Sequence, residues 1–331
     1  MHRPRIGIYW CASCGGCEEA VVDLAEDVLG LVERVNIVFW PCAMDFKKTD
    51  LEAIPDGSLL AVLLNGAIRS SEQEEMARLL RRKCRFLIAY GSCACTGGVP
   101  ALANQFTREQ ILRFVYEEAP TNLNQEGKRP AVNFEEENRS LTLPEFRRVV
   151  RSLDQVVEVD YYVPGCPPTP KVTRGALGAL LDGRMPPKGS VLSPDVALCE
   201  ECPRRDTKPA DLSFAAFRRP VEVLLDPRTC FLAQGVVCMG PGTRQGCEAQ
   251  CPSGNMPCTG CFGGTDRVKD QGAKLLSSLC ANLAPRDETE IDQALSGIPD
   301  PVGTFYRYAM ARSLLRGHAR LGDSRPSQPG Q

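Results

Sequence analysis

The sequence predicts an α/β protein whose parallel sheet is followed by a loop-rich, cysteine-dense region. Two observations support this prediction. In the first half, short apolar runs alternate with segments of helical periodicity, as in sheets whose parallel strands are joined by helices. In the second half the periodicity fades, and eight of the 17 cysteines fall between residues 199 and 261.

Five apolar runs are expected to form strands, and they cover residues 6–10, 35–40, 58–66, 85–91 and 156–163. The run at 58–66 is apolar on both faces, which is typical of a buried parallel strand. Helices are expected from Val21 onward, over 70–83 and over 171–181. Ser70 and the basic end of the 70–83 helix fit capping and the helix dipole. Strands and helices that alternate in this order predict a doubly wound, flavodoxin-like sheet.

The chain of 331 residues is therefore expected to form two domains. Residues 1–188 should form the flavodoxin-like domain, which a charged, irregular insertion interrupts near residues 120–150. Residues 189–315 should form a second, cysteine-rich domain, where many of the 26 Pro and 29 Gly residues gather. The tail, residues 316–331, is rich in Arg, Ser, Pro and Gly, a composition typical of disorder.

Composition excludes several classes of protein. The net charge is −2, and 24% of the residues are charged, which gives no indication of nucleic-acid binding. No apolar run reaches the roughly 18 residues that a membrane helix needs. The first residues lead directly into a strand without an apolar signal region. We therefore expect a cytoplasmic protein, in which thiols stay reduced and available to metals.

Cysteines follow three of the expected strands. Cys14 and Cys17 come after the first strand, Cys93 after the fourth and Cys166 after the fifth. Because the carboxyl ends of parallel strands meet at one edge of a sheet, these loops should lie together. Four converging thiolates are the ligand set of one 4Fe–4S cluster. Gly15 and Gly16 permit the tight turn that this convergence needs.

The second half contains eight further thiols, enough ligands for two more clusters. They are Cys199, Cys202, Cys230, Cys238, Cys247, Cys251, Cys258 and Cys261. A pair of structural zinc sites is the alternative, because Cys-x2-Cys pairs are also zinc-ribbon signals. The two His residues lie near the termini, so thiolate alone is expected to hold any metal. A disulfide framework suits short secreted chains rather than this one. Cys42, Cys84 and Cys280 are interpreted as buried small hydrophobic residues.

In combination, the cysteine motifs resemble those of the small subunit of nickel–iron hydrogenases. The best match is the cytoplasmic, methyl-viologen-reducing type that works with heterodisulfide reductase. The resemblance covers nearly the whole chain and rests on Cys14-Gly-Gly-Cys17-Glu18, Gly91-Ser-Cys93-Ala, Gly165-Cys166-Pro-Pro168, Glu201-Cys202-Pro-Arg204, Cys230-Phe-Leu, Cys238-Met-Gly-Pro241, Thr243-Arg-x-Gly-Cys247 and Pro257-Cys-Thr-Gly-Cys261.

The resemblance implies three 4Fe–4S clusters. The proximal cluster would use Cys14, Cys17, Cys93 and Cys166, the medial cluster Cys247, Cys251, Cys258 and Cys261, and the distal cluster Cys199, Cys202, Cys230 and Cys238. Periplasmic uptake relatives have His at the place of Cys199 and lack a fourth medial cysteine. Thiolate at both places implies lower potentials, because His ligation raises them.

Three side chains near the proximal loop keep open roles. Cys11-x2-Cys14-x2-Cys17 imitates the start of a ferredoxin run, but the fourth Cys of that run would fall at Val21. Cys11 is therefore an alternative ligand, and Cys95 has no assigned role. Glu18 is a possible proton relay at a subunit interface. The competing interpretation of Glu18 is a charge that favours the helix N-terminus.

The resemblance also implies function and partners. A large subunit would hold the nickel–iron site and split H2, and this chain would relay the electrons. The acceptor would be a small iron–sulfur subunit and a heterodisulfide reductase complex, a hetero-oligomer capable of electron bifurcation. No catalytic arrangement of its own is recognisable in the chain. The alternatives are a quinone-reductase-type iron–sulfur subunit, which the eight later cysteines argue against, and a zinc-stabilised scaffold without redox activity.

The proximal edge is expected to face the large subunit because it is lined by Trp10, Val99, Pro100, Pro164 and Pro167. Such apolar groups suit an obligate interface. Electrons would enter at the proximal thiols and leave near the distal ones.

Overall fold

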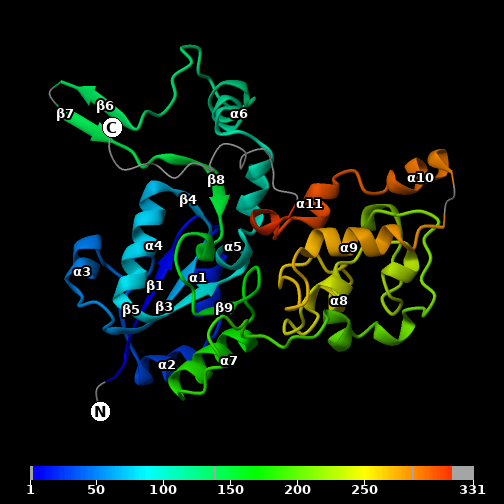
Figure 1. Cartoon of the computed structure of the whole chain (residues 1–331), viewed down its shortest axis with the longest axis horizontal. Coiled ribbons are helices and arrows are strands. Elements are labelled where there is room, and N and C mark those ends of the chain that lie inside the picture. Colours follow the sequence, from blue (N-terminus) through cyan, green and yellow to red (C-terminus); the bar gives the residue numbers. More distant parts are fainter. Residues whose placement is uncertain (1–2, 138, 285–286, 315–331) are drawn as a thin grey trace.

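The computed structural model describes residues 3–137, 139–284 and 287–314. At its centre is a sheet in which all neighbouring strands are parallel. The strand order is β2-β1-β3-β5-β9, with β1 (Arg5–Trp10), β2 (Asn36–Phe39), β3 (Leu59–Asn65), β5 (Cys84–Tyr90) and β9 (Tyr161–Val163). This arrangement, shown in Figure 1, confirms the expected flavodoxin-like α/β fold.

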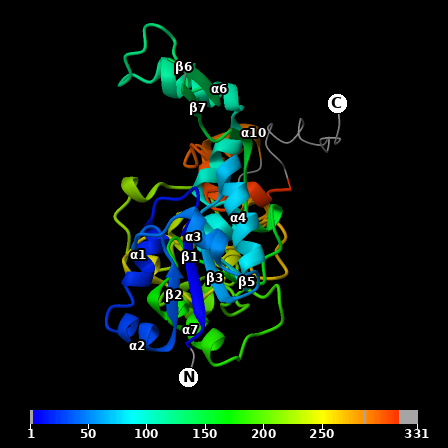
Figure 2. The same cartoon turned by 90° about the vertical axis from the view of Figure 1, so that its left-hand side faces the viewer.

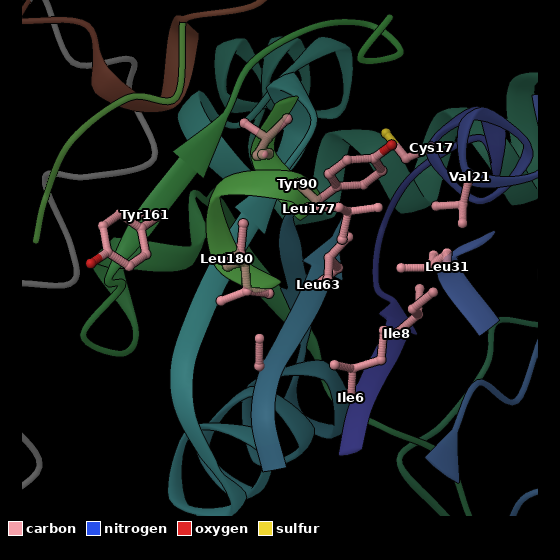
Figure 3. Packing of buried hydrophobic residues seen from close by; sticks show 14 of the residues in the cluster. Ile6, Ile8, Cys17, Val21, Leu31, Leu63, Tyr90, Tyr161, Leu177 and Leu180 are labelled. Carbon is pink, nitrogen blue, oxygen red and sulfur yellow. The ribbon is translucent and has the colours of Figure 1, made fainter. Parts of the chain in front are cut away.

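Helices cover both faces of the sheet. One face is covered by α1 (Gly16–Val22), α2 (Asp27–Arg34) and α7 (Pro170–Leu181), and the other by α3 (Lys48–Ala53) and α4 (Ser71–Lys83). Figure 3 shows Leu63 of β3 beside Leu177 of α7 and Ile8 of β1 beside Leu31 of α2, all on the first face. Leu63 belongs to one apolar cluster and the adjacent Leu64 to the other. A central strand buried on both faces therefore has no polar alternation.

The structure differs from the prediction at two places. The helix after the first Cys loop is divided into α1 and α2, because Ala25 has a φ of 51° that interrupts the helix. The last strand covers only Tyr161–Val163. Just before it, the Asp160 carboxylate accepts the N–H of Leu87 at 2.8 Å. The N–H of Leu87 on β5 is therefore bonded to a side chain and is not available to a backbone carbonyl of a longer β9.

The charged insertion forms an arm, which we define as residues 106–145. The elements along it and at its two ends are α5 (Ser92–Thr96), η1 (Val99–Gln105), α6 (Arg108–Arg113), η2 (Phe114–Glu118), β6 (Asn133–Glu136), β7 (Arg139–Thr142) and β8 (Phe146–Arg151). β6 and β7 form an antiparallel hairpin. β8 returns to the sheet domain and pairs antiparallel with β4 (Ile68–Ser70). Figures 1 and 2 show the hairpin and α6 projecting from the rest of the chain.

The second half is loop-rich, as predicted, and has an apolar cluster of its own. Its elements are short: η4 (Leu198–Glu201), η5 (Arg205–Thr207), η6 (Pro220–Glu222), η7 (Leu232–Gln234), η8 (Gly240–Gly242), α8 (Gln250–Ser253), α9 (Gln271–Cys280), α10 (Glu288–Leu295), α11 (Pro301–Phe305) and η9 (Met310–Arg312). Phe214, Phe231, Leu275 and Phe305 are buried in the cluster. The limits predicted for the two domains stay a prediction.

The second half contacts the sheet domain through α5. The Ser92 hydroxyl donates to the carbonyl of Cys261 at 2.5 Å, and the Thr96 hydroxyl donates to the carbonyl of Tyr308 at 2.6 Å. Among the described residues, no helix combines the length and the apolar character that crossing a membrane requires. The tail, residues 316–331, for which disorder is predicted, lies outside the described residues.

Candidate metal centres

The first Cys loop is fixed at the carboxyl end of β1 by bonds to the end of β3. The N–H of Cys11 donates to the carbonyl of Asn65, and Ala12 and Ala67 exchange two backbone hydrogen bonds of 2.9 Å. Gly15, with a φ of 89°, turns the chain into α1. This turn places Cys17 in the first turn of that helix, where it is buried, and leaves Cys14 exposed.

The second loop is shaped by glycines that leave room for sulfur. Gly91 and Gly98, on either side of Cys93, have φ values of 86° and 55°. A Cβ at Gly91 would lie 2.3 Å from the Sγ of Cys17, and a Cβ at Gly98 would lie 2.5 Å from the Sγ of Cys93. Any larger residue would therefore fill the space beside these sulfur atoms.

The third loop lies against the second. The N–H of Ser92 donates to the carbonyl of Gly165 at 2.7 Å, and the N–H of Gly91 donates to the carbonyl of Val163 at 2.8 Å. These bonds bring Cys166, which is exposed, next to the Cys93 loop. The three loops thus meet at one edge of the sheet.

The four proximal thiols influence one another electrostatically. Burial raises the pKa of Cys17, and the charges of Cys93, Cys166 and Cys14 raise it further. Burial raises the pKa of Cys93 to about 12, again with a contribution from Cys166 and Cys14. Four thiolates this close repel one another unless a cationic centre lies between them. The donor set therefore fits a metal cluster.

A second set consists of Cys199, Cys202, Cys230 and Cys238. Burial raises the pKa of Cys199, and the charges of Cys202 and Cys230 raise it further, while Lys208 lowers it. Burial raises the pKa of Cys238 to about 12, and Cys199 and Cys230 add to this shift. A Cβ at Gly240 would lie 3.5 Å from the Sγ atoms of both Cys199 and Cys238, so this glycine borders the set closely.

A third set consists of Cys247, Cys251, Cys258 and Cys261. These four thiols, together with Cys166, help to line a cavity of about 230 Å³. Burial raises the pKa of Cys261 to about 12, with contributions from Cys247, Cys166 and Cys251. The N–H groups of Ala249 and Gln250 oppose the rise in the pKa of Cys247 that burial causes. Backbone donors aimed at cysteine sulfur are a known means of tuning a cluster.

The three sets form a row. Cys166 of the proximal set lines the same cavity as the four thiols of the third set. Burial raises the pKa of Cys258 in the third set, and the charge of Cys238 in the second set raises it further. The N–H of Met239 also donates to the carbonyl of Cys258 at 2.9 Å. The set of Cys247, Cys251, Cys258 and Cys261 therefore lies between the other two.

No group of three or more His, Cys, Asp and Glu side chains in the described ranges is arranged to hold a single metal ion. A cubane cluster spreads its four thiolates around a body of several atoms, whereas a single zinc ion draws thiolate sulfur to about 2.3 Å. All 17 cysteines are free thiols.

Arg204 organises the loops beside the second and third sets, a role that its sequence context does not reveal. It is buried, and its guanidinium donates to the carbonyls of Asp226, Thr229 and Pro252 and to Asn255 Oδ1. It also lies 4.0 Å from the centre of the Phe231 ring. One cation thus satisfies backbone carbonyls of the loop at residues 226–229 and of the short helix α8.

The remaining five cysteines belong to none of these sets, although Cys95 is close enough to Cys93 that the charge of Cys93 adds to the rise in the pKa of Cys95 caused by burial. Cys11, Cys84 and Cys95 are buried in the apolar cluster on the other face of the sheet. Of these three, the sequence predicts burial only for Cys84. The expectation of burial is wrong for Cys42 and Cys280, which are exposed. Cys42 lies in the turn after β2, and Cys280 is the last residue of α9, whose buried side is formed by residues such as Leu275 and Leu279.

Glu18 is part of a buried hydrogen-bond network that the sequence does not reveal. Its Oε1 accepts from the Nδ2 of Asn65 at 2.6 Å, and its Oε2 accepts from the indole N–H of Trp40. Asn65 also accepts from the Ser13 hydroxyl at 3.1 Å. Burial raises the pKa of Glu18, and both hydrogen bonds oppose the rise. The carboxylate is thus enclosed, although it lies in the first turn of α1.

The edge beside the proximal thiols has exposed apolar groups. Trp10 and Val99 are 40% and 46% exposed. Pro167 is exposed as well, whereas Pro164 is buried within the chain.

Comparison with known proteins agrees with this architecture. The family model described as "NADH ubiquinone oxidoreductase, 20 Kd subunit" matches residues 14–180. A [NiFeSe]-hydrogenase chain from Dm. baculatum superposes with a TM-score of 0.50 at 18% identity, over 79% of this chain and 95% of that chain, which supports the fold. Fold and family model together define an oxidoreductase subunit built on a parallel sheet with Cys loops at one edge.

Two relatives specify the family. The iron-sulfur subunit of the F420-non-reducing hydrogenase of Archaeoglobus profundus is 37% identical over 305 residues, which cover 91% of this chain and 94% of that protein. The corresponding F420-non-reducing hydrogenase subunit of Methanothermobacter thermautotrophicus is 34% identical over 95% of this chain and 96% of its own length. The chain belongs to this family of hydrogenase subunits.

Proposed function

We propose that this chain relays electrons from H2 oxidation on a nickel–iron large subunit through three 4Fe–4S clusters. The observation that carries the proposal is the succession of three cysteine sets, in which Cys166 shares a cavity with the four medial thiols and Met239, next to Cys238, donates its N–H to the carbonyl of Cys258. When bound, the clusters supply one-electron transfer. The chain itself supplies the ligands, their order and the exclusion of water from buried sulfur atoms.

Each cluster is assigned to one set of four thiols. The proximal cluster takes Cys14, Cys17, Cys93 and Cys166, the medial cluster Cys247, Cys251, Cys258 and Cys261, and the distal cluster Cys199, Cys202, Cys230 and Cys238. Three contacts support this assignment: Gly91 of the Cys93 loop lies against the sulfur of Cys17, the four medial thiols line one cavity, and Gly240 borders the sulfur atoms of Cys199 and Cys238. The proximal set belongs to the domain proposed for residues 1–188, and the other two sets belong to the domain proposed for residues 189–315.

The proposed direction of electron transfer depends on which end of the three cysteine sets the catalytic large subunit covers. The exposed Trp10 and Val99 beside the proximal thiols suit an obligate interface. The distal thiols lie at the opposite end of the row, so electrons leave there. The proposed acceptor is a small iron–sulfur subunit with a heterodisulfide reductase complex, in which electron bifurcation would follow. The proposed compartment is the cytoplasm, which keeps thiols reduced.

Glu18 is the candidate for proton movement at the proximal interface. Its carboxylate is bonded to Asn65, which also accepts from Ser13 in the first Cys loop. These groups form a short polar path from the loop to a buried acid. The bonds from Trp40 and Asn65 also fix α1 against the ends of β2 and β3, which gives the same carboxylate a positioning role.

Metal analysis of the anaerobically purified complex tests the function. Three cubanes correspond to about twelve irons and twelve sulfides per chain. The complex should contain the large subunit and should reduce a viologen dye with H2. About four irons together with stoichiometric zinc would favour a zinc-bearing second domain instead. Iron without a large subunit or H2-dependent activity would favour a quinone-reductase-type subunit.

A further inference from the structure

The arm ends in a hairpin that has an apolar side and a polar side. Phe134 lies directly opposite Leu141. The N–H of Leu143 donates to the carbonyl of Val132 at 2.9 Å, so Val132 and Leu143 are the opposed pair two positions further along the strands. Opposed residues and their second neighbours share one face of a two-stranded ribbon. Val132, Phe134, Leu141 and Leu143 therefore form one face, which we call the arm face.

The arm face is open to solvent in this chain. Its four side chains are between 47% and 53% exposed. The opposite side of the hairpin is polar, with Asn133 paired with Thr142 and Glu135 paired with Ser140. A two-stranded hairpin is at best marginally stable in water without a surface to pack on. Contiguous apolar side chains on a protruding element mark a site of protein–protein contact.

Further exposed apolar side chains lie along the arm toward its base. Phe106, Phe114 and Val115 are between 47% and 56% exposed. They belong to the segment that leads from η1 through α6 and η2 toward the hairpin. The apolar surface is therefore not confined to the tip of the arm.

The base of the arm is next to the proximal thiols. β8, which follows the arm, pairs with β4, and β4 begins one residue after Ala67, which bridges to Ala12 in the first Cys loop. At the other end of the arm, η1 starts at Val99, shortly after Cys93. The arm thus continues the apolar edge to which Trp10 and Val99 belong. Figure 1 shows the hairpin on the side of the sheet away from α8 and α10 of the second half.

We propose that the arm extends the docking surface for the catalytic large subunit, with the arm face packed against that partner. This inference rests on the proposed function, because it assigns the arm to the subunit that covers the proximal edge. The partner surface it fits is an apolar strip with a polar border, since the opposed pair Glu136 and Arg139 follows Phe134 and Leu141 on the same side of the hairpin. An acceptor bound near the distal thiols would lie at the other end of the molecule.

Two matched double variants test the arm face in the co-expressed holoenzyme. Phe134→Ser with Leu141→Ser removes a directly opposed pair from the arm face. Asn133→Ser with Thr142→Ser changes the neighbouring opposed pair on the polar side. The first variant should bind the large subunit roughly tenfold or more weakly, because truncated apolar anchors dominate interface energetics. The second should bind within about twofold of the unmodified chain, as expected for contacts outside an interface centre.

Retention of the large subunit on the tagged chain during serial dilution gives the affinity, and iron content shows whether each variant has folded. A photo-crosslinking residue at Leu143 provides a measurement that does not depend on variant folding, and it should join the large subunit. Unchanged affinity of the Phe134/Leu141 variant would overturn the arm proposal and leave the relay function intact. Cross-links to a second copy of this chain or to the acceptor would also overturn it. If the unmodified chain retained no large subunit, the relay function itself would fail.

Discussion

Replacement of Gly91 by Ala should remove the proximal cluster while leaving the other two in place. Gly91 has a φ of 86° and a ψ of 160°, a region that is essentially restricted to glycine and costs an L-residue roughly 1–3 kcal/mol. The added Cβ would lie 2.3 Å from the Sγ of Cys17, whereas ordinary contacts are 3.4–4 Å. The sulfur would therefore have to move by about 1 Å, because the glycine backbone is held by its own hydrogen bonds. A ligand displaced this far cannot keep its bond to iron.

The matched control is Gly175→Ala. Gly175 lies within α7, and a Cβ there would meet no atom within 4 Å. Alanine inside a helix is favoured over glycine by about 1 kcal/mol, so this variant should be as stable as the unmodified chain or more stable. Both variants change one glycine to alanine in the same domain, and only one of them crowds a sulfur atom.

The assay combines iron content, electron paramagnetic resonance and H2-dependent dye reduction on the anaerobic complex. Gly91→Ala should lose about four of about twelve irons, together with the proximal signal and nearly all dye reduction. Gly175→Ala should retain all three properties. A Gly91→Ala complex with full iron and normal activity would refute the assignment of Cys17 as a ligand. In that case the sulfur of Cys17 would have moved away from the new methyl group without loss of the cluster.

Cys199→His should keep the distal cluster but raise its potential, so that potentiometry shifts upward and transfer to a low-potential acceptor falls more than dye reduction. Cys251→Pro should convert the medial cluster to a 3Fe–4S form with a new resonance in the oxidised protein, and an unchanged spectrum would remove Cys251 from the ligands. Asp160→Asn should cost roughly 3 kcal/mol of unfolding free energy, because it breaks the buried pair with Arg81. Burial by itself raises the pKa of Asp160, but the bonds from Lys188 and Arg81 outweigh burial and lower it. The ionised carboxylate therefore contributes to the free energy of unfolding at neutral pH, and this contribution is lost as the pH falls below the unfolded pKa of 3.8. Urea titrations should therefore show a steeper acid loss for the unmodified chain than for Asp160→Asn, and equal slopes would contradict this account.

The sheet could be predicted because burial on both faces leaves a direct trace in the sequence. The run containing Leu63 and Leu64 has no polar alternation, and Ser70 marks the start of the following helix with a side chain that accepts the N–H of Gln73. The positions of the proximal Cys loops could also be predicted, because each loop begins where a predicted strand ends. The sequence overestimates the length of β9 because the bond from Leu87 to Asp160 depends on three-dimensional packing.

The partition of the later thiols could not be derived from spacing alone. Cys202 and Cys230 are 28 positions apart in the chain, with no regular element longer than a few residues between them. Their loops are held by the buried guanidinium of Arg204, and a single arginine gives no periodic signal. The hydrogen bonds of Glu18 could not be predicted for a similar reason, because the sequence places Trp40 and Asn65 at the ends of strands and gives no sign that they bond to Glu18. The hairpin of the arm is hidden because its four apolar residues occur in a charged insertion.

Ser92 has a consequence for the timing of electron flow in the proposed relay. Its N–H donates to the Gly165 carbonyl of the third proximal loop, and its hydroxyl donates to the Cys261 carbonyl beside the medial thiols. One residue thus fixes the separation of the first two redox centres from both sides. Tunnelling between them would need no conformational step, since the two bonds of Ser92 hold the Gly165 loop and the Cys261 loop together. The slow steps of turnover would then lie at the two ends of the row, where partners exchange, and viscosity should affect those steps alone.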